Sequence, residues 1–438
     1  MKFFIRIITF VCILSILITS VMSVSAVSYE YDGNIESETV LLVNMDTGIP
    51  VLEKNADMVR YPASLTMIMT FIIVSENVED FENTRVEIKQ DVLDVLLGTG
   101  STTSGVDRKV GEKMTVKDLV YCMMVASGID AALVLADYVG GGSIEKFVDM
   151  MNSKAEELGC VDTNFVNPHG LHDEMQRTTA RDLYTITSYA LSLPYFSEIS
   201  NEHTYYCEGD DWPLTTTNYM IDLNRGGDYF YTYAKGIKTG ATEEAGRCLI
   251  TTAIADGYAY MCICMGASYE TDYNGAMRDA KELLRWALLN LRLSRLRTTD
   301  TPVCEIDVNF STTDKTILLY PKENVNTILP KEYDEQNVTV EPNIPESVDA
   351  PIKAGDIIGS ATVYYLDEAI QTVDLVAGDD VARSPVAYAM FVIKGIVTSW
   401  IFWLAIIIAL VLLVVYIYLA GNVRNKKKQR RVKRYRRL

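Results

Sequence analysis

Residues 233–240 read Tyr-Ala-Lys-Gly-Ile-Lys-Thr-Gly, and this segment decides the fold together with the two apolar runs that follow it. Cys248–Ala255 and Tyr258–Ala267 are rich in apolar and β-branched residues, and Gly257 lies between them. Runs of this length bounded by turn residues are typical of β-strands, and a glycine between two such runs favours a hairpin. The sequence therefore predicts three successive strands, the last two joined as a hairpin.

The segments around these strands predict an opening hairpin and a helical insertion. Thr39–Met45 is an apolar, β-branched run, Asp46-Thr47-Gly48 supplies a turn, and Val51-Leu52 resumes the pattern. Helices are expected where apolar residues recur at helical spacing. They are expected from Tyr61 to about Val74, as two short helices within residues 115–139 that break at Ser127-Gly128, from Ile144 to Leu158, and from Asp279 to Leu296.

A second, smaller domain is expected after Thr301-Pro302. Residues 301–380 lose helical periodicity and carry short alternating runs, such as Cys304–Phe310 and Ala361–Tyr365. Alternation with a period of two residues is the pattern of a half-buried strand. The predicted architecture is therefore an α/β domain over residues 27–300, followed by a small all-β domain over residues 301–380.

The composition is ordinary for a globular protein, but the charge is distributed unevenly. Apolar residues make up 49% and charged residues 22% of the 438 residues, which excludes an intrinsically disordered or collagen-like chain. The formal net charge is −18, yet ten of the 40 basic residues lie within residues 424–438. Residues 7–423 hold 28 basic and 58 acidic residues, a net charge of −30. With this excess of acidic residues, residues 7–423 would not neutralise the phosphates of a nucleic acid, so no nucleic-acid partner is expected.

The start of the chain resembles a secretory signal peptide. Residues 1–26 begin with Lys2 and Arg6, continue with an apolar run from Ile7 to Ile18, and end with the small residues Val24-Ser25-Ala26, which suit cleavage. An uncleaved N-terminal anchor is the alternative interpretation.

The end of the chain predicts a membrane anchor. Trp400–Ala420 contains no charged residue and is long enough to cross a bilayer as a helix. We expect a transmembrane helix over residues 400–421, closed by Gly421-Asn422, after a membrane-proximal segment over residues 381–399. The basic tail, residues 422–438, fits the positive-inside rule. The expected protein is therefore a single-pass cell-membrane protein with its body outside the cytoplasm and its tail in the cytoplasm.

No metal and no cofactor are expected. Seven cysteines follow the predicted signal peptide, an odd and unpatterned set that forms no disulfide framework. Cys262 and Cys264 would point to one face of an apolar strand, where packing as small hydrophobic side chains is expected. His169 and His172 lie three residues apart in one loop, but no third ligand cluster accompanies them.

Three separated segments carry the chemistry of the chain. They are Ser64-Leu65-Thr66-Met67, Ser127-Gly128-Ile129 and Lys238-Thr239-Gly240. In order and spacing they resemble the S-x-x-K, S-x-N and K-T-G motifs of penicillin-recognising serine acyl-transferases. The resemblance is strongest to the serine-type D-alanyl-D-alanine carboxypeptidases, the low-molecular-mass penicillin-binding proteins of peptidase family S11. Further segments that support it are Asn167–Asp173, Thr178–Ala180, Ala245–Leu249 and Ala350–Asp356.

This resemblance implies a fold, a ligand and a role for each motif residue. The fold would be a β-lactamase/transpeptidase-like domain, an antiparallel sheet with a helical subdomain. The ligand would be the D-Ala-D-Ala terminus of a peptidoglycan stem peptide. Ser64 would be the nucleophile, and Ser127 would relay a proton to the leaving group. The substrate-binding residues would be Lys238, Thr239 and Gly240, together with the backbone N–H groups of Ser64 and Ala241 as an oxyanion hole.

Two residues that define the motifs are replaced. The family's lysine would face Ser64 one helical turn later, but Met67 stands there, and a thioether is not a useful proton acceptor. The asparagine of the second motif is replaced by Ile129. Because an amide that faces an apolar side chain would lack its hydrogen bond, the two replacements together indicate a pocket repacked as apolar. Losing a positioned general base typically costs ~10²–10⁴ in rate.

Three hypotheses follow from these departures. The favoured one is a catalytically impaired homologue that still engages stem peptides, with its binding of β-lactams left open. The second is an active carboxypeptidase that forms acyl-Ser64 with an unconventional base, such as Lys238 with a pKa lowered by burial. The third is a non-catalytic interaction scaffold of the cell envelope.

Overall fold

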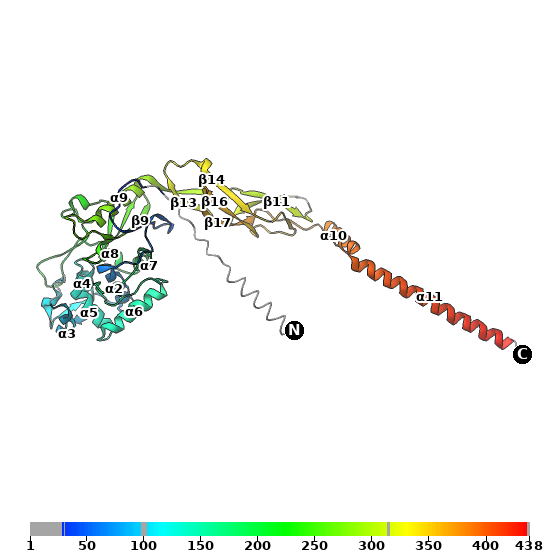
Figure 1. Ribbon diagram of the computed structural model, residues 1–438, viewed down its shortest axis with the longest axis horizontal. Helices are drawn as coiled ribbons and strands as arrows, with labels where there is room; N and C mark the ends of the chain where they lie inside the picture. Colours follow the sequence, from blue (N-terminus) through cyan, green and yellow to red (C-terminus); the bar gives the residue numbers. More distant parts are fainter. Residues whose placement is uncertain (1–28, 30, 98–102, 313–315, 436–438) are drawn as a thin grey trace. The chain divides into compact units, whose positions relative to one another are not determined.

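The computed structural model describes Tyr29 and residues 31–97, 103–312 and 316–435, with only the backbone given for residues 421–435. The chain divides into two compact units (Figure 1). The first comprises the chain up to Leu296 with residues 326–338 and 365–370, and the second holds the remainder. The predicted signal peptide, residues 1–26, lies outside the described residues.

The first unit is built on a five-stranded sheet of order β2-β1-β9-β8-β7, and every neighbouring pair is antiparallel. The predicted strands are confirmed. Gly257 has a φ of 82°, the left-handed conformation that a tight hairpin turn requires. The strands are β1 (Thr39–Asn44), β2 (Pro50–Lys54), β7 (Ala234–Thr242), β8 (Gly246–Ala255) and β9 (Tyr258–Ala267).

Helices cover both faces of this sheet. Residues 260–267 of β9 are all buried, which requires cover on both faces because successive side chains point to opposite sides. Met261, Ile263 and Met265 face the core that the sheet shares with the helical subdomain. On the other face α9 (Gly275–Asn290) packs against β8 and β9.

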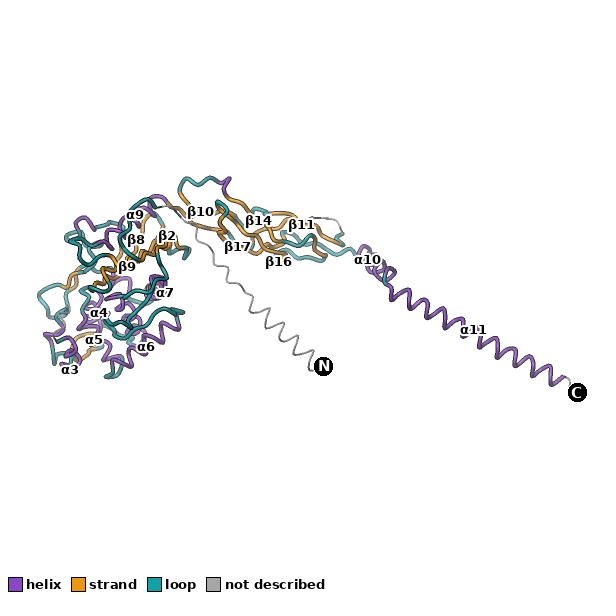
Figure 2. The backbone as a smooth tube through the Cα atoms, in the orientation of Figure 1, coloured by secondary structure: helices purple, strands orange, loops and turns teal. Residues whose placement is uncertain are grey.

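The predicted helical insertion is confirmed, and α2 (Met67–Asn77) lies at its centre. Every residue of α2 from Met67 to Val74 is buried, and the helix contacts four others. Figure 2 shows the helices of this subdomain, in purple, gathered on one side of strands β8 and β9. Two small two-stranded sheets and several single turns complete the unit. The surrounding helices are α4 (Val116–Met124), α5 (Ile129–Val139), α6 (Ile144–Glu157) and α7 (Ala180–Leu191), and the smaller elements are α3 (Gln90–Leu93), α8 (Phe196–Ser200), β3 (Arg85–Glu87), β4 (Lys113–Thr115), β5 (Thr204–Tyr205) and β6 (Leu214–Thr215).

Two helix boundaries differ from the prediction. The chain enters α2 through a 3₁₀ turn, Ala63–Thr66, and the φ of 49° at Ala63 prevents an α-helix from running from Tyr61 through this residue. At the other end α9 stops at Asn290 rather than Leu296. Residues 291–297, Leu-Arg-Leu-Ser-Arg-Leu-Arg, instead form strand β10, paired with β13 (Val325–Pro330).

The second unit contains the predicted all-β domain, a six-stranded sheet of order β14-β16-β17-β12-β11-β15. Its core is a separate cluster of alternating buried side chains that includes Ile306, Leu319 and Leu375. The strands are β11 (Cys304–Asn309), β12 (Thr316–Pro321), β14 (Val338–Asn343), β15 (Ser347–Asp349), β16 (Ile357–Tyr365) and β17 (Glu368–Ala377).

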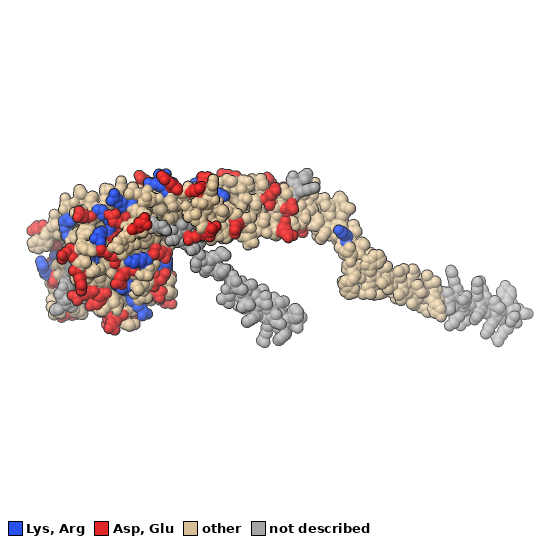
Figure 3. Space-filling view, turned by 45° about the horizontal axis from the view of Figure 1, so that its top comes forward, with Lys and Arg blue, Asp and Glu red and all other residues tan. Residues whose placement is uncertain are grey.

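Two apolar helices end the chain, α10 (Pro385–Thr398) and α11 (Trp400–Tyr435). Trp400–Ala420 is long and apolar enough to cross a membrane, and no other helix among the described residues meets that test. Figure 3 shows this stretch free of charge, whereas acidic side chains are spread over both folded units. The prediction that Gly421-Asn422 closes the helix is wrong. A single glycine lowers helix stability by only about 1 kcal/mol, and the lysines and arginines that follow are good helix formers.

We expect the substitution Leu319→Ala to destabilise the β-rich unit by about 2–5 kcal/mol, because Leu319 on β12 is completely buried. Its neighbour Leu318, on the opposite face of the same strand, is 41% exposed, so Leu318→Ala is expected to change stability by less than about 0.5 kcal/mol. Denaturant unfolding of the full chain in detergent measures both. Equal losses in the two variants would contradict the assigned strand register.

Candidate active site

Ser64 lies on the tight turn between the sheet and α2, and a neighbouring loop holds that turn in place. Gly170 approaches so closely that a Cβ atom there would lie 1.9 Å from the carbonyl oxygen of Ala63. Gln176 is buried, and its side-chain amide donates to the hydroxyl of Thr66 at 2.9 Å. The Thr70 hydroxyl donates to the Pro168 carbonyl at 2.5 Å. Loop residues 168–176 therefore fix the position of Ser64.

Met67 occupies the first position of α2 and is closed off from solvent. Its side chain is 0% exposed, and it is absent from the lining of the cleft beside Ser64. The Met67 Sδ lies 3.8 Å from the Ser127 Oγ. The position where the family carries its motif lysine thus holds a thioether inside the protein core.

Ser127 lies in the break between α4 and α5, with a φ of 59°. A non-glycine residue in this left-handed region is strained, and such strain persists only where surrounding contacts fix the backbone. One of these contacts is a hydrogen bond from the Gly128 N–H to the Cys122 carbonyl at 3.0 Å. A second set of contacts involves Asp130, which is fully buried. Its carboxylate accepts hydrogen bonds from the backbone N–H groups of Ser104 and Val106. Ile129 begins α5 between them and lines the cleft with an apolar surface.

Lys238 is buried behind strand β7 and does not line the cleft. Its ammonium group donates to the Ser127 Oγ at 2.7 Å and to the Thr239 carbonyl at 3.1 Å, and the residue is only 1% exposed. Burial lowers the pKa of Lys238 from its ordinary value to about 7. Near neutral pH this lysine therefore exchanges between its charged and neutral forms.

The remaining residues of the third motif form the edge of the cleft. A Cβ atom on Gly240 would lie 3.0 Å from the Ser64 backbone nitrogen, so β7 comes into direct contact with the serine turn. The Thr239 hydroxyl hydrogen-bonds the Thr217 hydroxyl at 2.5 Å. The open edge of β7 is thus available to an extended peptide beside Ser64.

The cleft has a volume of about 590 Å³ and is lined by several predicted site residues, but not by all of them. Ser64, Ser127 and Ile129 line it from the helical side, whereas Met67 and Lys238 lie beneath it. The described residues offer the Ser64 hydroxyl no hydrogen-bond partner. From the sheet side the lining is provided by Thr239, Gly240, Ala241, Thr242, Glu243 and Arg247.

Arg247 is the residue that our sequence-based site assignment missed. It lines the cleft opposite Ala241 on β8 and is its only basic residue among those described. Its guanidinium group donates to the Thr271 carbonyl at 3.0 Å, and its Nε atom is buried without a partner. A guanidinium with unused donors suits a carboxylate. Its place in Ala245–Leu249, one of the segments that support the resemblance, is the sequence signal.

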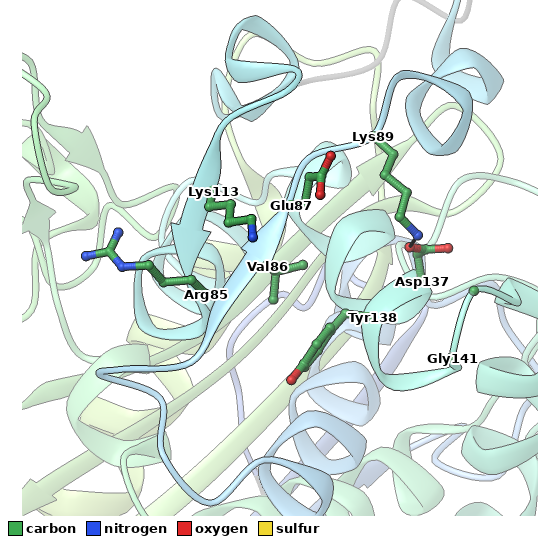
Figure 4. Close-up of a pocket in the computed structure, with 9 residues that line it drawn as sticks. Arg85, Val86, Glu87, Lys89, Lys113, Asp137, Tyr138 and Gly141 are labelled. Carbon is green, nitrogen blue, oxygen red and sulfur yellow. Dashed lines mark hydrogen bonds and ion pairs between the residues drawn. The ribbon is translucent and has the colours of Figure 1, made fainter.

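A second hollow of about 310 Å³ lies in the helical subdomain, between the two-stranded sheet β3–β4 and the end of α5. Figure 4 shows Lys89 and Asp137 meeting at one side of it, where their charged groups are 2.6 Å apart, while Arg85 points away. Its described lining holds acidic and basic groups and the Tyr138 side chain but no serine, threonine or cysteine, so we do not assign chemistry to it.

The two histidines of the loop beside Ser64 lie in different surroundings. His169 is buried, burial lowers its pKa to about 4, and its Nδ1 atom accepts from the Leu171 N–H at 3.1 Å. His172 instead packs edge-on against Tyr61. No group of three or more metal-binding side chains occurs in the described part of the chain.

The fold and the site define the class of this protein. An antiparallel sheet with a helical subdomain, a serine at the start of a buried helix and a Lys-Thr-Gly strand edge are the features of penicillin-recognising serine peptidases. The chain belongs to the D-alanyl-D-alanine carboxypeptidase family Peptidase S11, whose family model matches residues 23–269. Residues 295–383 match the C-terminal domain of penicillin-binding protein 5.

Individual relatives agree with this assignment. The D-alanyl-D-alanine carboxypeptidase DacF of Bacillus subtilis is 27% identical over 353 residues, which cover 80% of this chain and 87% of that protein. The crystal structure of the D-alanyl-D-alanine carboxypeptidase DacD from Francisella tularensis is 25% identical, with a TM-score of 0.66 over 81% of this chain and 96% of that one. Penicillin-binding protein 5 of Haemophilus influenzae shares the fold at 24% identity and a TM-score of 0.63, covering 81% of this chain and all of that one.

We expect Gly170→Ala to cost about 3 kcal/mol or more of folding free energy. The new Cβ atom would add left-handed strain and would also collide with the Ala63 carbonyl, so the Ser64 turn would have to move. Gly159→Ala is the matched control. It has a φ of 79°, similar to the 87° of Gly170, but no atom within 4 Å, and is expected to cost only about 1 kcal/mol. Chemical unfolding of the full chain tests both, and equal costs would show that the loop does not support the serine turn.

Proposed function

We propose that this protein is a membrane-anchored homologue of the S11 carboxypeptidases that binds the D-Ala-D-Ala end of peptidoglycan stem peptides and turns them over poorly. The observation that carries the proposal is the buried thioether of Met67, 3.8 Å from Ser127, at the position of the motif lysine. Among the described residues none accepts a hydrogen bond from the Ser64 hydroxyl, so the serine would remain a weak nucleophile.

The binding part of the site supports retained recognition. The cleft beside Ser64 is open, and the edge of β7 can pair with an extended peptide backbone. Arg247 and the Thr239 hydroxyl lie in its wall, where they would receive the terminal carboxylate, and the charged form of Lys238 lies directly behind that wall. The Ser64 and Ala241 N–H groups would polarise the scissile carbonyl.

A second candidate function is an active carboxypeptidase in which Lys238 is the base. The pKa of about 7 favours it, because a lysine near neutrality can accept a proton at physiological pH. The proton of Ser64 would pass to Ser127, whose hydroxyl is already hydrogen-bonded to Lys238 at 2.7 Å. This relay requires Ser64 to reach Ser127 once a substrate is bound.

The C-terminal helix would anchor the protein in the membrane. Trp400–Ala420 would cross the cytoplasmic membrane, with the basic residues after it on the cytoplasmic side, and the α/β unit and the six-stranded sheet outside. Residues 1–26 would serve as the export signal. The folded units would then reach stem peptides in the cell wall.

Covalent labelling tests the loss of the base. Full-length protein in detergent, incubated with a fluorescent penicillin, is expected to label at Ser64 at least ~10²-fold more slowly than an intact S11 relative. The double variant Met67→Lys, Ile129→Asn is expected to recover labelling, and a Ser64→Ala substitution in that background should abolish it.

The outcomes of the labelling experiment separate the three hypotheses. Labelling of the unmodified protein within minutes, lost in Ser64→Ala, would overturn the impaired site and favour Lys238 as base. If the double variant is not labelled by penicillin, and if it also fails to bind a D-Ala-D-Ala peptide, a non-catalytic scaffold would be favoured instead.

The pH dependence of peptide binding provides a second test. We expect the affinity for a D-Ala-D-Ala peptide to fall several-fold between pH 6 and 8, because Lys238 loses its charge as the pH rises through about 7. Calorimetric titration measures the affinity, and Arg247→Gln is expected to weaken it at both pH values. If Lys238 acts as base, the dependence has the opposite sign: acylation by penicillin would rise through the same pH range.

A further inference from the structure

We propose that Cys122 and Cys207 form a disulfide bond that ties the β5–β6 hairpin to helix α4. The two residues are 85 positions apart in sequence, yet their sulfur atoms lie 3.6 Å apart. Both are buried as free thiols in the structure. A disulfide needs a separation of about 2.05 Å, which small side-chain rotations can supply from this distance.

Contacts on one side of the pair bring the two chain segments together without the bond. Tyr121 on α4 stacks on Tyr205 of β5, with ring centroids 3.7 Å apart and planes within 8°. The Tyr205 hydroxyl donates to the carboxylate of Asp118, one turn earlier on α4, at 2.8 Å. Tyr121, directly before Cys122, and Tyr205, two residues before Cys207, therefore hold the two segments in contact without the disulfide.

Contacts on the other side complete the docking. Asp210, three residues after Cys207, forms an ion pair with Lys109 at 2.8 Å, and Glu208 forms one with Arg85 at 2.8 Å. Because the hairpin is held on both sides of Cys207, the sulfur atoms stay in contact and little conformational entropy remains to be lost when they bond.

The other close pair of sulfur atoms provides an internal comparison. Cys262 and Cys264 have sulfur atoms 3.7 Å apart, almost the same distance. They lie two residues apart on β9, so their Cβ atoms project in parallel from one strand, about 6.8 Å apart along it. A disulfide requires Cβ atoms about 3.5–4.5 Å apart, so this pair cannot close without breaking the sheet. Cys122 and Cys207 lie on different elements and are free of this restriction.

The bond would stabilise the part of the molecule that forms one wall of the cleft. The Cys122 carbonyl accepts from Gly128 in the strained Ser127 turn, and the Val125 carbonyl accepts from Thr217 at 3.2 Å. Thr217 follows β6 and hydrogen-bonds Thr239. Closing Cys122 onto Cys207 would therefore link the backbone that carries Ser127 to the segment that reaches the Lys-Thr-Gly edge.

The chemistry is thiol–disulfide exchange with a small disulfide as oxidant. A thiolate attacks oxidised glutathione and releases one reduced glutathione, and the second thiolate then attacks the mixed disulfide and releases another. Two protein thiols are oxidised, one glutathione disulfide is reduced, and the two thiol protons pass to the two glutathione thiolates. The inference rests on the proposed export of both folded units, because disulfides persist outside the cytoplasm. It does not depend on catalysis by Ser64.

Peptide mapping tests the pairing. Full-length protein in detergent is equilibrated with oxidised and reduced glutathione, or with reduced glutathione alone, then blocked with N-ethylmaleimide and digested. The oxidised sample is expected to yield one cross-linked peptide pair containing Cys122 and Cys207, whereas Cys262 and Cys264 are recovered blocked. Recovery of Cys122 and Cys207 as blocked thiols or as separate glutathione adducts would overturn the proposal, as would a different pairing.

Thermal unfolding provides a second measurement. The oxidised protein is expected to melt about 5–10 °C higher than the reduced protein, because the bond closes a long loop. Cys207→Ser should remove this difference. Cys160→Ser changes a buried cysteine outside the pair and should preserve the difference. Persistence of the difference in Cys207→Ser would overturn the pairing, and the mapping of the unmodified chain decides the question if that variant fails to fold.

Discussion

The hydrogen bond between Lys238 and Ser127 is the contact on which the site depends. It joins strand β7 of the sheet to the break between α4 and α5, and so sets the distance between the two walls of the cleft. Both partners carry a cost, because Lys238 is an ammonium group in a buried position and Ser127 has a strained backbone. The hydrogen bond between them offsets part of the desolvation cost of the buried ammonium group.

Met67 and Ile129 show why those losses leave the fold intact. A buried lysine without its partners would be an uncompensated charge, whereas methionine in the same place adds apolar contacts to the core around α2. The protein core therefore tolerates the replacements, and under the proposed function their cost would fall on proton transfer. This separation explains how a full carboxypeptidase architecture can outlast the group that activates its nucleophile.

Most of the fold could be predicted from the sequence because its strands and helices carry their periodicity locally. The sequence did not predict strand β10 at residues 291–297, because leucines and arginines at this spacing also fit the last turns of an amphipathic helix. Site positions were harder, since they depend on contacts between distant segments. The sequence around Lys238 does not indicate that its ammonium group is buried behind the cleft wall. It also does not indicate that Arg247, on the next strand, lines the cleft instead. The proximity of Cys122 and Cys207 likewise follows only from the docked hairpin.

The position of Lys238 also limits what the site can do at any one pH. As a proton acceptor it must be neutral, and as a positive charge behind the carboxylate site it must be protonated. A bound carboxylate favours the protonated form, so ligand binding itself raises the pKa of the lysine and removes the base that hydrolysis would need. Under the proposed function, a site with only one titrating lysine would gain affinity for a carboxylate ligand at the expense of turnover. In the S-x-x-K and K-T-G motifs of the family, two lysines are present, so one can accept a proton while the other stays charged. Because Met67 replaces the first of them, Lys238 alone would have to do both.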